Sequence, residues 1–319
     1  MTRALMMLLV AAFAVAPAGP VAAQQKVTVL CSPNPAWCDA IKAEFPKATG
    51  VQLDFIRLSS GEALARLRAE KGRPSFDVWF GGTGDPHLVA AEEGLTEFYR
   101  PKAWDDLRPQ LREAVGMKYI PLYAGVLGWA VNEKLLQEKG LAVPKTWTDL
   151  ADPRYKGLLA MPNPNTSGTG YTMLATVLQV YGDDKGWDLM KQIHKNMAQY
   201  TRSGADPGLL TGRGEVAVGI TFAHDAVDQV IKGFPVKAGA PEDTGFEIGG
   251  LSLVKGSPNR DAAVKFIDWA LTPEAQKLAA ERGQSYQVPS NSKTPVAKQA
   301  PRFEDFKVIK YDFAKYGSK

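Results

Sequence analysis

Strand and helix patterns alternate near the N-terminus, and this alternation restricts the chain to an α/β fold. Runs rich in β-branched and aromatic residues predict strands at Lys26–Leu30, Val51–Ile56 and Phe76–Phe80. Helical composition fills the two intervals, over Ala36–Ala48 and Ala63–Lys71. Strands separated by helices at this spacing form βαβ units, so we expect a parallel sheet covered by helices.

The loop after each of these strands is rich in small and hydroxyl residues. Ser32–Asn34, Ser59–Gly61 and Gly81–Thr83 occupy these places. Ligands of open α/β sheets bind outside the carboxyl ends of the strands, so the three loops together predict half of a binding site. Loops of this composition are also the usual connection from strand to helix. The candidate ligand-binding residues here are Ser32, Ser60, Gly82 and Thr83.

Residues 1–23 are typical of a secretory signal peptide. Arg3 supplies a positive charge, Leu5–Val15 supply an apolar stretch, and Val21–Ala23 offer a cleavage site of small residues. The apolar run is too short and too interrupted by proline to span a bilayer. We therefore expect cleavage near Ala23 and an exported mature protein.

Charge and length narrow the class of protein further. The formal net charge is +4, and residues of both signs are interspersed. Nucleic-acid binding would need a clustered basic stripe with stacking aromatics, so we expect no nucleic-acid partner. Even without the signal peptide, the 319-residue chain exceeds what one hydrophobic core usually supports, which predicts two lobes.

The chain has two cysteines, Cys31 and Cys38, which flank the loop Ser-Pro-Asn-Pro-Ala-Trp. In an oxidising compartment a pair this close predicts a disulfide that rigidifies the loop. The alternative is a metal pair, which would need further thiolates or histidines nearby in the sequence.

An extended apolar stretch at Tyr119–Val131 leads into a second α/β pattern. Its proline and two glycines argue against a helix, and it is long enough to pass from one lobe to another. After it we expect three helices, a strand and an extended return segment, in the order Glu133–Glu138, Gly170–Tyr181, Trp187–Lys195, Val216–Thr221 and Thr244–Val254. Two amphipathic helices follow at Ala262–Leu271 and Ala275–Ala280.

Met161–Thr172 has the composition of an anion-binding helix start. Two prolines delay the helix, and the sequence Ser-Gly-Thr-Gly then places hydroxyls and accessible backbone at its N-terminus. Unpaired N–H groups and the helix dipole favour a phosphate or another oxyanion there. An ordinary N-cap loop is the alternative interpretation. The candidate phosphate-binding residues are Ser167, Gly168, Thr169 and Gly170.

Three polar residues border apolar strands in the second half. His224 and Asp225 come directly after a predicted strand, where they could hydrogen-bond hydroxyls or ligate a metal. Capping of the following helix is the alternative. Glu247 precedes an apolar return strand, and there a ligand contact and a carboxylate at the rim are equally good interpretations.

Enzyme motifs are absent from the sequence. It contains no Gly-x-Ser-x-Gly elbow, no P-loop lysine and no complete dinucleotide fingerprint. The three histidines lack zinc-type spacing, and we expect His87 and His194 at the surface. We therefore expect neither catalysis nor a cofactor. A secreted phosphate-ester hydrolase, the alternative from another class, would need a nucleophile with a base or a metal cluster.

Together these features resemble a periplasmic solute-binding protein of an ABC importer, in the group that contains ferric-iron, thiamine and phosphorylated-solute binders. The segments typical of that group are Phe76–Gly82, Trp147–Gly157 and Gly245–Gly250. The resemblance covers essentially the whole mature chain. It implies a periplasmic-binding-protein type II fold, in which two α/β lobes joined by a two-strand hinge close over a ligand in the cleft.

On this resemblance we assign residues 24–123 and 248–285 to lobe 1 and residues 124–247 to lobe 2. Residues 286–319 are expected to form a C-terminal segment that packs across the lobes. We expect a monomer that binds a small anionic solute and delivers it to an inner-membrane ABC permease. Helix N-termini and hydroxyls would meet the ligand charge, without requiring a dedicated arginine.

Within the group, the chain resembles hexose-phosphate binders most. Ferric-binding members typically have two adjacent tyrosines, and this chain has Phe-Ala-His-Asp at the corresponding place. The resemblance implies that His224, Asp225 and Glu247 hold the sugar hydroxyls. Related aminoalkylphosphonate binders would turn the two carboxylates toward an ammonium group. A ferric-iron carrier that uses these residues with Tyr123 and Tyr171 is the alternative.

Overall fold

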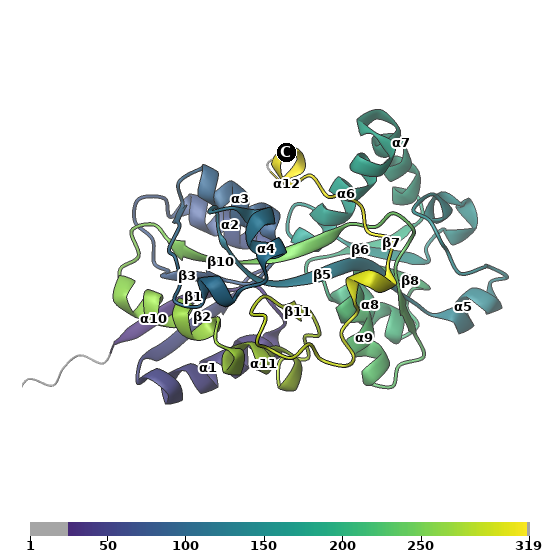
Figure 1. Ribbon diagram of the computed structural model, residues 1–319. Helices are drawn as coiled ribbons and strands as arrows, with labels where there is room; N and C mark the ends of the chain where they lie inside the picture. The colour runs from purple at the N-terminus through teal and green to yellow at the C-terminus, as the bar shows by residue number, and fades with distance from the viewer. Residues whose placement is uncertain (1–24, 318–319) are drawn as a thin grey trace, which may run out of the picture.

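The computed structural model describes residues 25–317 as two α/β lobes joined by a pair of long strands (Figure 1). The predicted signal peptide lies outside the described residues. β5 (Ile120–Val131) and β10 (Phe246–Val254) pair antiparallel and run from one lobe into the other. Within residues 25–317, no helix combines the length and the apolar character needed to cross a membrane.

Lobe 1 contains the predicted parallel βαβ units. Its strand order is β2-β1-β3-β10-β5, with β1 parallel to both of its neighbours and β10 antiparallel to β3. Its strands are β1 (Lys26–Cys31), β2 (Gln52–Arg57), β3 (Val78–Phe80), β4 (Thr96–Glu97) and β11 (Val288–Pro289). Its helices are α1 (Pro35–Thr49), α2 (Ser60–Ala69), α3 (Gly84–Glu92), α4 (Pro109–Val115), α10 (Arg260–Ala270) and α11 (Pro273–Glu281).

Lobe 2 repeats the α/β pattern on the other side of β5. The strand order is β5-β8-β6-β7, with β6 parallel to both of its neighbours and β9 paired to β5. The strands are β6 (Leu159–Pro162), β7 (Met197–Thr201), β8 (Val218–Phe222) and β9 (Lys237–Gly239). The helices are α5 (Glu133–Glu138), α6 (Gly168–Tyr181), α7 (Asp183–His194), α8 (Asp206–Gly212) and α9 (Ala223–Ile231).

Each lobe has its own hydrophobic core. Phe45, Phe80 and Phe266 pack together in lobe 1, and Trp129 and Trp147 meet edge to face in lobe 2. Every residue of β5 is buried, because its first half belongs to one core and its second half to the other. The predicted lobe boundaries at 123 and 247 fall inside β5 and β10, and they stay a prediction.

The C-terminal tail, residues 303–317, ends in the short helix α12 (Phe313–Tyr316). It crosses α6, where the backbone N–H of Asp312 donates to Gln179 Oε1 at 2.7 Å. Phe313 packs against an apolar cluster that includes residues of α6, and a Cβ on Gly317 would lie 2.6 Å from Leu88 of α3. The tail thus contacts a helix of each lobe (Figure 1).

The predicted disulfide is confirmed. It joins Cys31 at the end of β1 to Cys38 in α1, and both residues are buried. The metal-pair alternative is therefore wrong. The bond ties the loop that carries Ser32 to the first turns of the helix that follows it.

The prediction of a surface position is wrong for His87, which is fully buried, whereas His194 is exposed as expected. The imidazole of His87 stacks on Trp79, with 3.7 Å between the ring centroids. Its Nδ1 lies 2.8 Å from Ser252 Oγ and its Nε2 lies 3.0 Å from the Gly81 carbonyl oxygen. His87 therefore helps to fix the position of the glycine loop that follows β3, through its contact with the carbonyl group of Gly81.

Candidate functional site

A cleft between the lobes brings together all but one of the candidate residues. They are Ser32, Ser60, Gly82, Thr83, Ser167, Gly168, Thr169, His224, Asp225 and Glu247. The exception is Gly170, which does not line the cleft. A Cβ on Gly170 would lie 2.4 Å from the carbonyl oxygen of Pro162, so this glycine allows α6 to pack closely on the loop before it.

Six helices begin at this cleft. The residues at their N-caps all line it, and they are Asn34 of α1, Ser59 of α2, Thr83 of α3, Ser167 of α6, Ala205 of α8 and Phe222 of α9. The side chains of Asn34, Thr83 and Ser167 form no capping hydrogen bond. First-turn N–H groups lack partners within a helix and carry its positive dipole end, so the cleft is suited to an anion.

The wall from lobe 1 is made of hydroxyls whose positions are fixed. Ser32 Oγ accepts a hydrogen bond from Trp79 Nε1 at 2.9 Å, and Ser60 Oγ accepts one from the backbone N–H of Thr83 at 3.1 Å. Gly82 has a φ of +89°, and a Cβ there would lie 2.5 Å from Ser60 Oγ. The hydroxyl of Thr83 is buried without a partner among residues 25–317. These groups can still donate to a ligand.

The wall from lobe 2 approaches closely because its residues are small. A Cβ on Gly168 would lie 1.7 Å from Thr83 Oγ1, and one on Gly204 would lie 2.1 Å from Thr169 Oγ1. Ser167 and Thr169 are both buried at the start of α6. The Ser-Gly-Thr sequence therefore places two hydroxyls and an unobstructed backbone opposite the wall from lobe 1.

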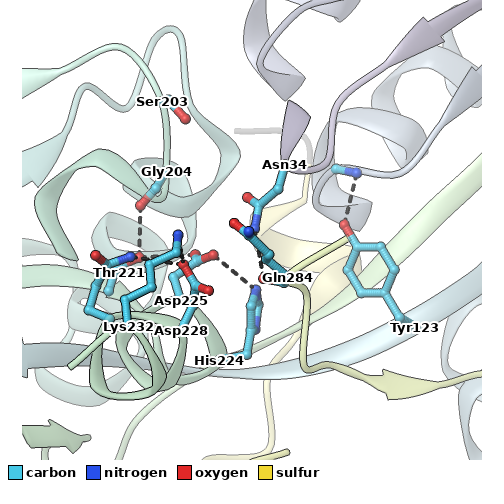
Figure 2. Close-up of polar contacts among 12 residues, drawn as sticks. Asn34, Tyr123, Ser203, Gly204, Thr221, His224, Asp225, Asp228, Lys232 and Gln284 are labelled. Atoms are coloured by element: carbon cyan, nitrogen blue, oxygen red, sulfur yellow. Dashed lines mark hydrogen bonds and ion pairs between the residues drawn. The ribbon is translucent and has the colours of Figure 1, made fainter. Parts of the chain in front are cut away.

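His224 and Asp225 lie in the first turn of α9, at the end of β8 (Figure 2). Asp225 Oδ2 lies 3.0 Å from the hydroxyl of Thr221, and Asp225 Oδ1 lies 3.6 Å from His224 Nε2. His224 Nδ1 is buried and has no partner in the described part of the chain. Burial lowers the pKa of His224, although Asp225 and Asp228 oppose this, so the neutral ring is favoured.

Glu247 on β10 lies directly across from Gly125 on β5. A Cβ on Gly125 would lie 2.9 Å from His224 Nδ1 and 3.2 Å from Glu247 Oε1, so the missing side chain leaves space for both groups. Burial raises the pKa of Glu247 well above its usual range, and Asp225 and Asp85 add to this. A protonated Glu247 can both donate and accept a hydrogen bond.

Arg57 and Ser203 also line the cleft and are not among the residues predicted from the sequence. Arg57 ends β2, at the sheet edge where ligands were expected, and this position was an available signal. Ser203 follows β7 (Met197–Thr201), a strand without a clear sequence pattern, so its loop could not be placed. The other additional lining residues are Pro33, Asn34, Ser59, Tyr123, Gly204, Ala205, Phe222 and Gln287.

The lobes meet directly beside the cleft. The backbone N–H of Gly61 donates to the carbonyl oxygen of Thr166 at 3.0 Å, and Ser59 Oγ donates to the carbonyl oxygen of Arg202 at 3.2 Å. Glu62 and Arg202 form an ion pair across the same junction. The N-terminus of α2 is thus in contact with lobe 2, and the structure represents a closed conformation.

The two tyrosines of the ferric-iron alternative lie apart. Tyr123 Oη accepts a hydrogen bond from the backbone N–H of Gly82 at 2.9 Å (Figure 2). Tyr171 does not line the cleft, and its hydroxyl bonds to the carbonyl oxygen of Tyr316. Across residues 25–317, no group of three or more His, Cys, Asp and Glu side chains is arranged to hold a metal ion. The iron alternative is therefore less well supported than an anion.

Two α/β lobes that close over a polar cleft define a type II solute-binding protein. The chain belongs to the bacterial extracellular solute-binding protein family, whose pattern matches residues 83–316. It is a periplasmic solute-binding protein of an ABC importer.

Three similar proteins illustrate the range of the family. An uncharacterized protein of Haemophilus influenzae is 41% identical over 94% of this chain and 88% of its own. A Salmonella typhimurium periplasmic protein named for 2-aminoethylphosphonate binding is 26% identical over 74% of this chain and 69% of its own. The structure of AfuA from Actinobacillus pleuropneumoniae with exogenous fructose 6-phosphate has 38% identity and a TM-score of 0.90, covering 93% of this chain and 94% of AfuA.

Proposed function

We propose that the protein captures a small phosphorylated or phosphonate solute in the cleft and delivers it to an inner-membrane ABC permease. The convergence of six helix N-termini on one cleft carries this proposal. Their dipoles make the cleft positive where N–H and hydroxyl groups are exposed to a ligand. The role is binding rather than catalysis.

Two groups of cleft residues differ in chemistry, and each suits one part of such a solute. Thr83, Ser167 and Thr169 with the adjacent backbone would hold the phosphorus oxyanion. His224, Asp225 and Glu247 would hold the other end of the solute, which is a set of hydroxyls in a hexose phosphate or an ammonium group in an aminoalkylphosphonate.

Two similarities support this class of solute. AfuA holds fructose 6-phosphate, and the Salmonella protein is named for an aminoalkylphosphonate. Both ligands combine a phosphorus oxyanion with a polar group of different charge. We propose that solute binding stabilises the closed lobes because the solute contacts both of them.

The first test is thermal unfolding of the mature protein with fructose 6-phosphate, 2-aminoethylphosphonate, inorganic phosphate and ferric citrate. A solute at a hundredfold excess over its dissociation constant stabilises by about 2.7 kcal/mol, which is readily measured. Stabilisation by an organic phosphate or phosphonate is the expected result. Stabilisation by ferric citrate alone would mean that the cleft serves iron.

Thr169→Val tests the group proposed to hold the oxyanion, because it removes a hydroxyl and nearly keeps the shape. We expect about tenfold weaker binding of every phosphorus-containing solute, by isothermal titration calorimetry. Thr49→Val, at the end of α1 and outside the cleft, is the control and should bind like the wild type. Unchanged affinity of Thr169→Val would remove this hydroxyl from the site.

Asp225→Ala tests the other group of cleft residues. It should change the preference between fructose 6-phosphate and 2-aminoethylphosphonate and leave inorganic phosphate nearly unaffected. The reason is that the proposal assigns Asp225 to the part of the solute that carries no phosphorus oxyanion. An equal loss for inorganic phosphate and its organic derivatives would contradict this division of the cleft.

A further inference from the structure

Arg57 extends from the last position of β2 into the cleft, where it is half-buried. Its Nε donates to the carbonyl oxygen of Pro33 at 3.2 Å, within the loop closed by the disulfide. Its Nη2 donates across the cleft to Ser203 Oγ at 3.1 Å. The guanidinium is therefore held by a rigid loop of its own lobe and by a hydroxyl of the other.

The charge of Arg57 has no direct counter-ion. No carboxylate of residues 25–317 forms an ion pair or a hydrogen bond with it. Glu62 is occupied by Arg202 and by the backbone N–H of Ser59, and Asp225 is hydrogen-bonded to Thr221. Asp206, Glu62 and Asp225 act on Arg57 only from a longer distance, and Asp206 acts most strongly. A charge that loses contact with water normally gains a partner of opposite charge, and the two hydrogen-bond partners of this guanidinium are uncharged.

The donors that remain on Arg57 suit an oxyanion. A guanidinium carries five N–H groups, and two bonds account for two of them. Burial lowers the pKa of Arg57, with Asp206, Glu62 and Asp225 opposing this, and an arginine remains charged under such a shift. The planar fork can therefore bind two oxygens of one phosphate or phosphonate group.

We infer that Arg57 is the fixed counter-charge for the solute's oxyanion and that its bond to Ser203 links this charge to closure of the lobes. The inference rests on the proposed function, since it concerns the same solute. It replaces the expectation that no dedicated arginine is required. Helix N-termini then supply the directional N–H groups, and Arg57 supplies the full positive charge.

The test compares Arg57→Gln and Arg57→Lys with Arg260→Gln, which removes an exposed arginine outside the cleft. The probe is fructose 6-phosphate, or 2-aminoethylphosphonate if the wild type prefers it, measured by calorimetry at several salt concentrations. We expect Arg57→Gln to weaken binding roughly 30-fold or more, because a charged hydrogen-bond partner is lost. The affinity of Arg57→Lys should lie between those of Arg57→Gln and the wild type, and the affinity of Arg260→Gln should equal that of the wild type.

A second readout separates a charge role from a merely structural one. The wild-type affinity should decrease with salt, and the affinity of Arg57→Gln should decrease less steeply, because one cation has been removed. Ser203→Ala keeps the charge and removes the link across the cleft, so it should speed dissociation of the solute about threefold. If Arg57→Gln does not fold, Arg57→Lys still tests the planar fork and Ser203→Ala still tests the link to closure.

The outcomes are distinguishable. If the wild type binds the probe and both Arg57 variants bind within twofold of it with the same salt dependence, the counter-charge is refuted and the proposed function stands. If Ser203→Ala dissociates at the wild-type rate, the link to closure is refuted. If the wild type binds no phosphate or phosphonate, the proposed function falls and the inference falls with it.

Discussion

The buried carboxyl of Asp85 should make the stability of the protein depend on pH, and one substitution should remove this dependence. Its side chain is 2% exposed, in the first turn of α3, and its Oδ1 has no hydrogen-bond partner among the described residues. Burial raises the pKa of this carboxyl to about 7, against opposing contributions from its own backbone N–H and from Tyr311. The ordinary value is 3.8.

The sign follows from comparing the two states. Below pH 3.8 Asp85 is protonated in the folded and the unfolded state, so its ionisation does not change the free energy of unfolding. Between that pH and about 7 only the unfolded state releases the proton, so the free energy of unfolding falls as pH rises. A shift of about three units, at about 1.4 kcal/mol each, gives a loss of about 4 kcal/mol above pH 7.

Asp85→Asn keeps the shape of the protonated carboxyl and cannot ionise. We expect it to exceed the wild type in free energy of unfolding by up to about 4 kcal/mol at pH 8. The difference should shrink steadily toward pH 4.5. The assay is urea denaturation followed by tryptophan fluorescence, without ligand, at intervals of pH. Asp188→Asn, which removes an exposed carboxylate on α7, is the control.

Two results would refute this reasoning. A difference between Asp85→Asn and the wild type that is the same at every pH would mean that Asp85 does not titrate in this range. A variant that is less stable than the wild type at pH 8 would mean that the ionised carboxylate stabilises the first turn of α3. The control should differ from the wild type by a small, constant amount.

Two further substitutions test the cleft and its support. Gly125→Ala should weaken the binding of organic phosphates about tenfold, because the new methyl group would displace His224. Gly208→Ala is the control, since its Cβ would meet nothing closer than 3.6 Å, and its affinity in calorimetry should equal that of the wild type. Replacing both Cys31 and Cys38 with alanine should lower the free energy of unfolding by about 2.5 kcal/mol, since the closed loop is short. Unchanged urea midpoints would contradict the second prediction.

The sequence predicted the architecture and most of the cleft because both depend on local patterns. Strand ends followed by Ser, Thr and Gly marked the loops that carry Ser32 and Thr83, and a helix start after two prolines marked the loop that carries Thr169. The carboxyl ends of parallel strands share one edge, so the topology alone brought the loops of Ser32 and Thr83 together. The pairing of Cys31 with Cys38 was equally local.

The residues that were missed depend on contacts distant in sequence. Arg57 looks like a solvated charge at a strand end, and only Ser203, on the other lobe, shows that it faces the cleft. His87 looks like a surface residue after a proline, but Trp79 and Ser252 enclose it. Composition also could not show that Gly170, unlike Gly168, faces its own loop.

The contacts of the C-terminal tail should differ between the open and the closed conformation of the two lobes. The tail bonds to Gln179 of α6 through Asp312 and lies against Leu88 of α3 at Gly317, so separation of the lobes must loosen one of these contacts. The neighbouring residue Ala314 is exposed, and the described chain holds no free cysteine. A dye attached through Ala314→Cys would therefore change its surroundings as the cleft opens and shuts. The same chain could serve as a reagentless optical sensor for the solute it carries.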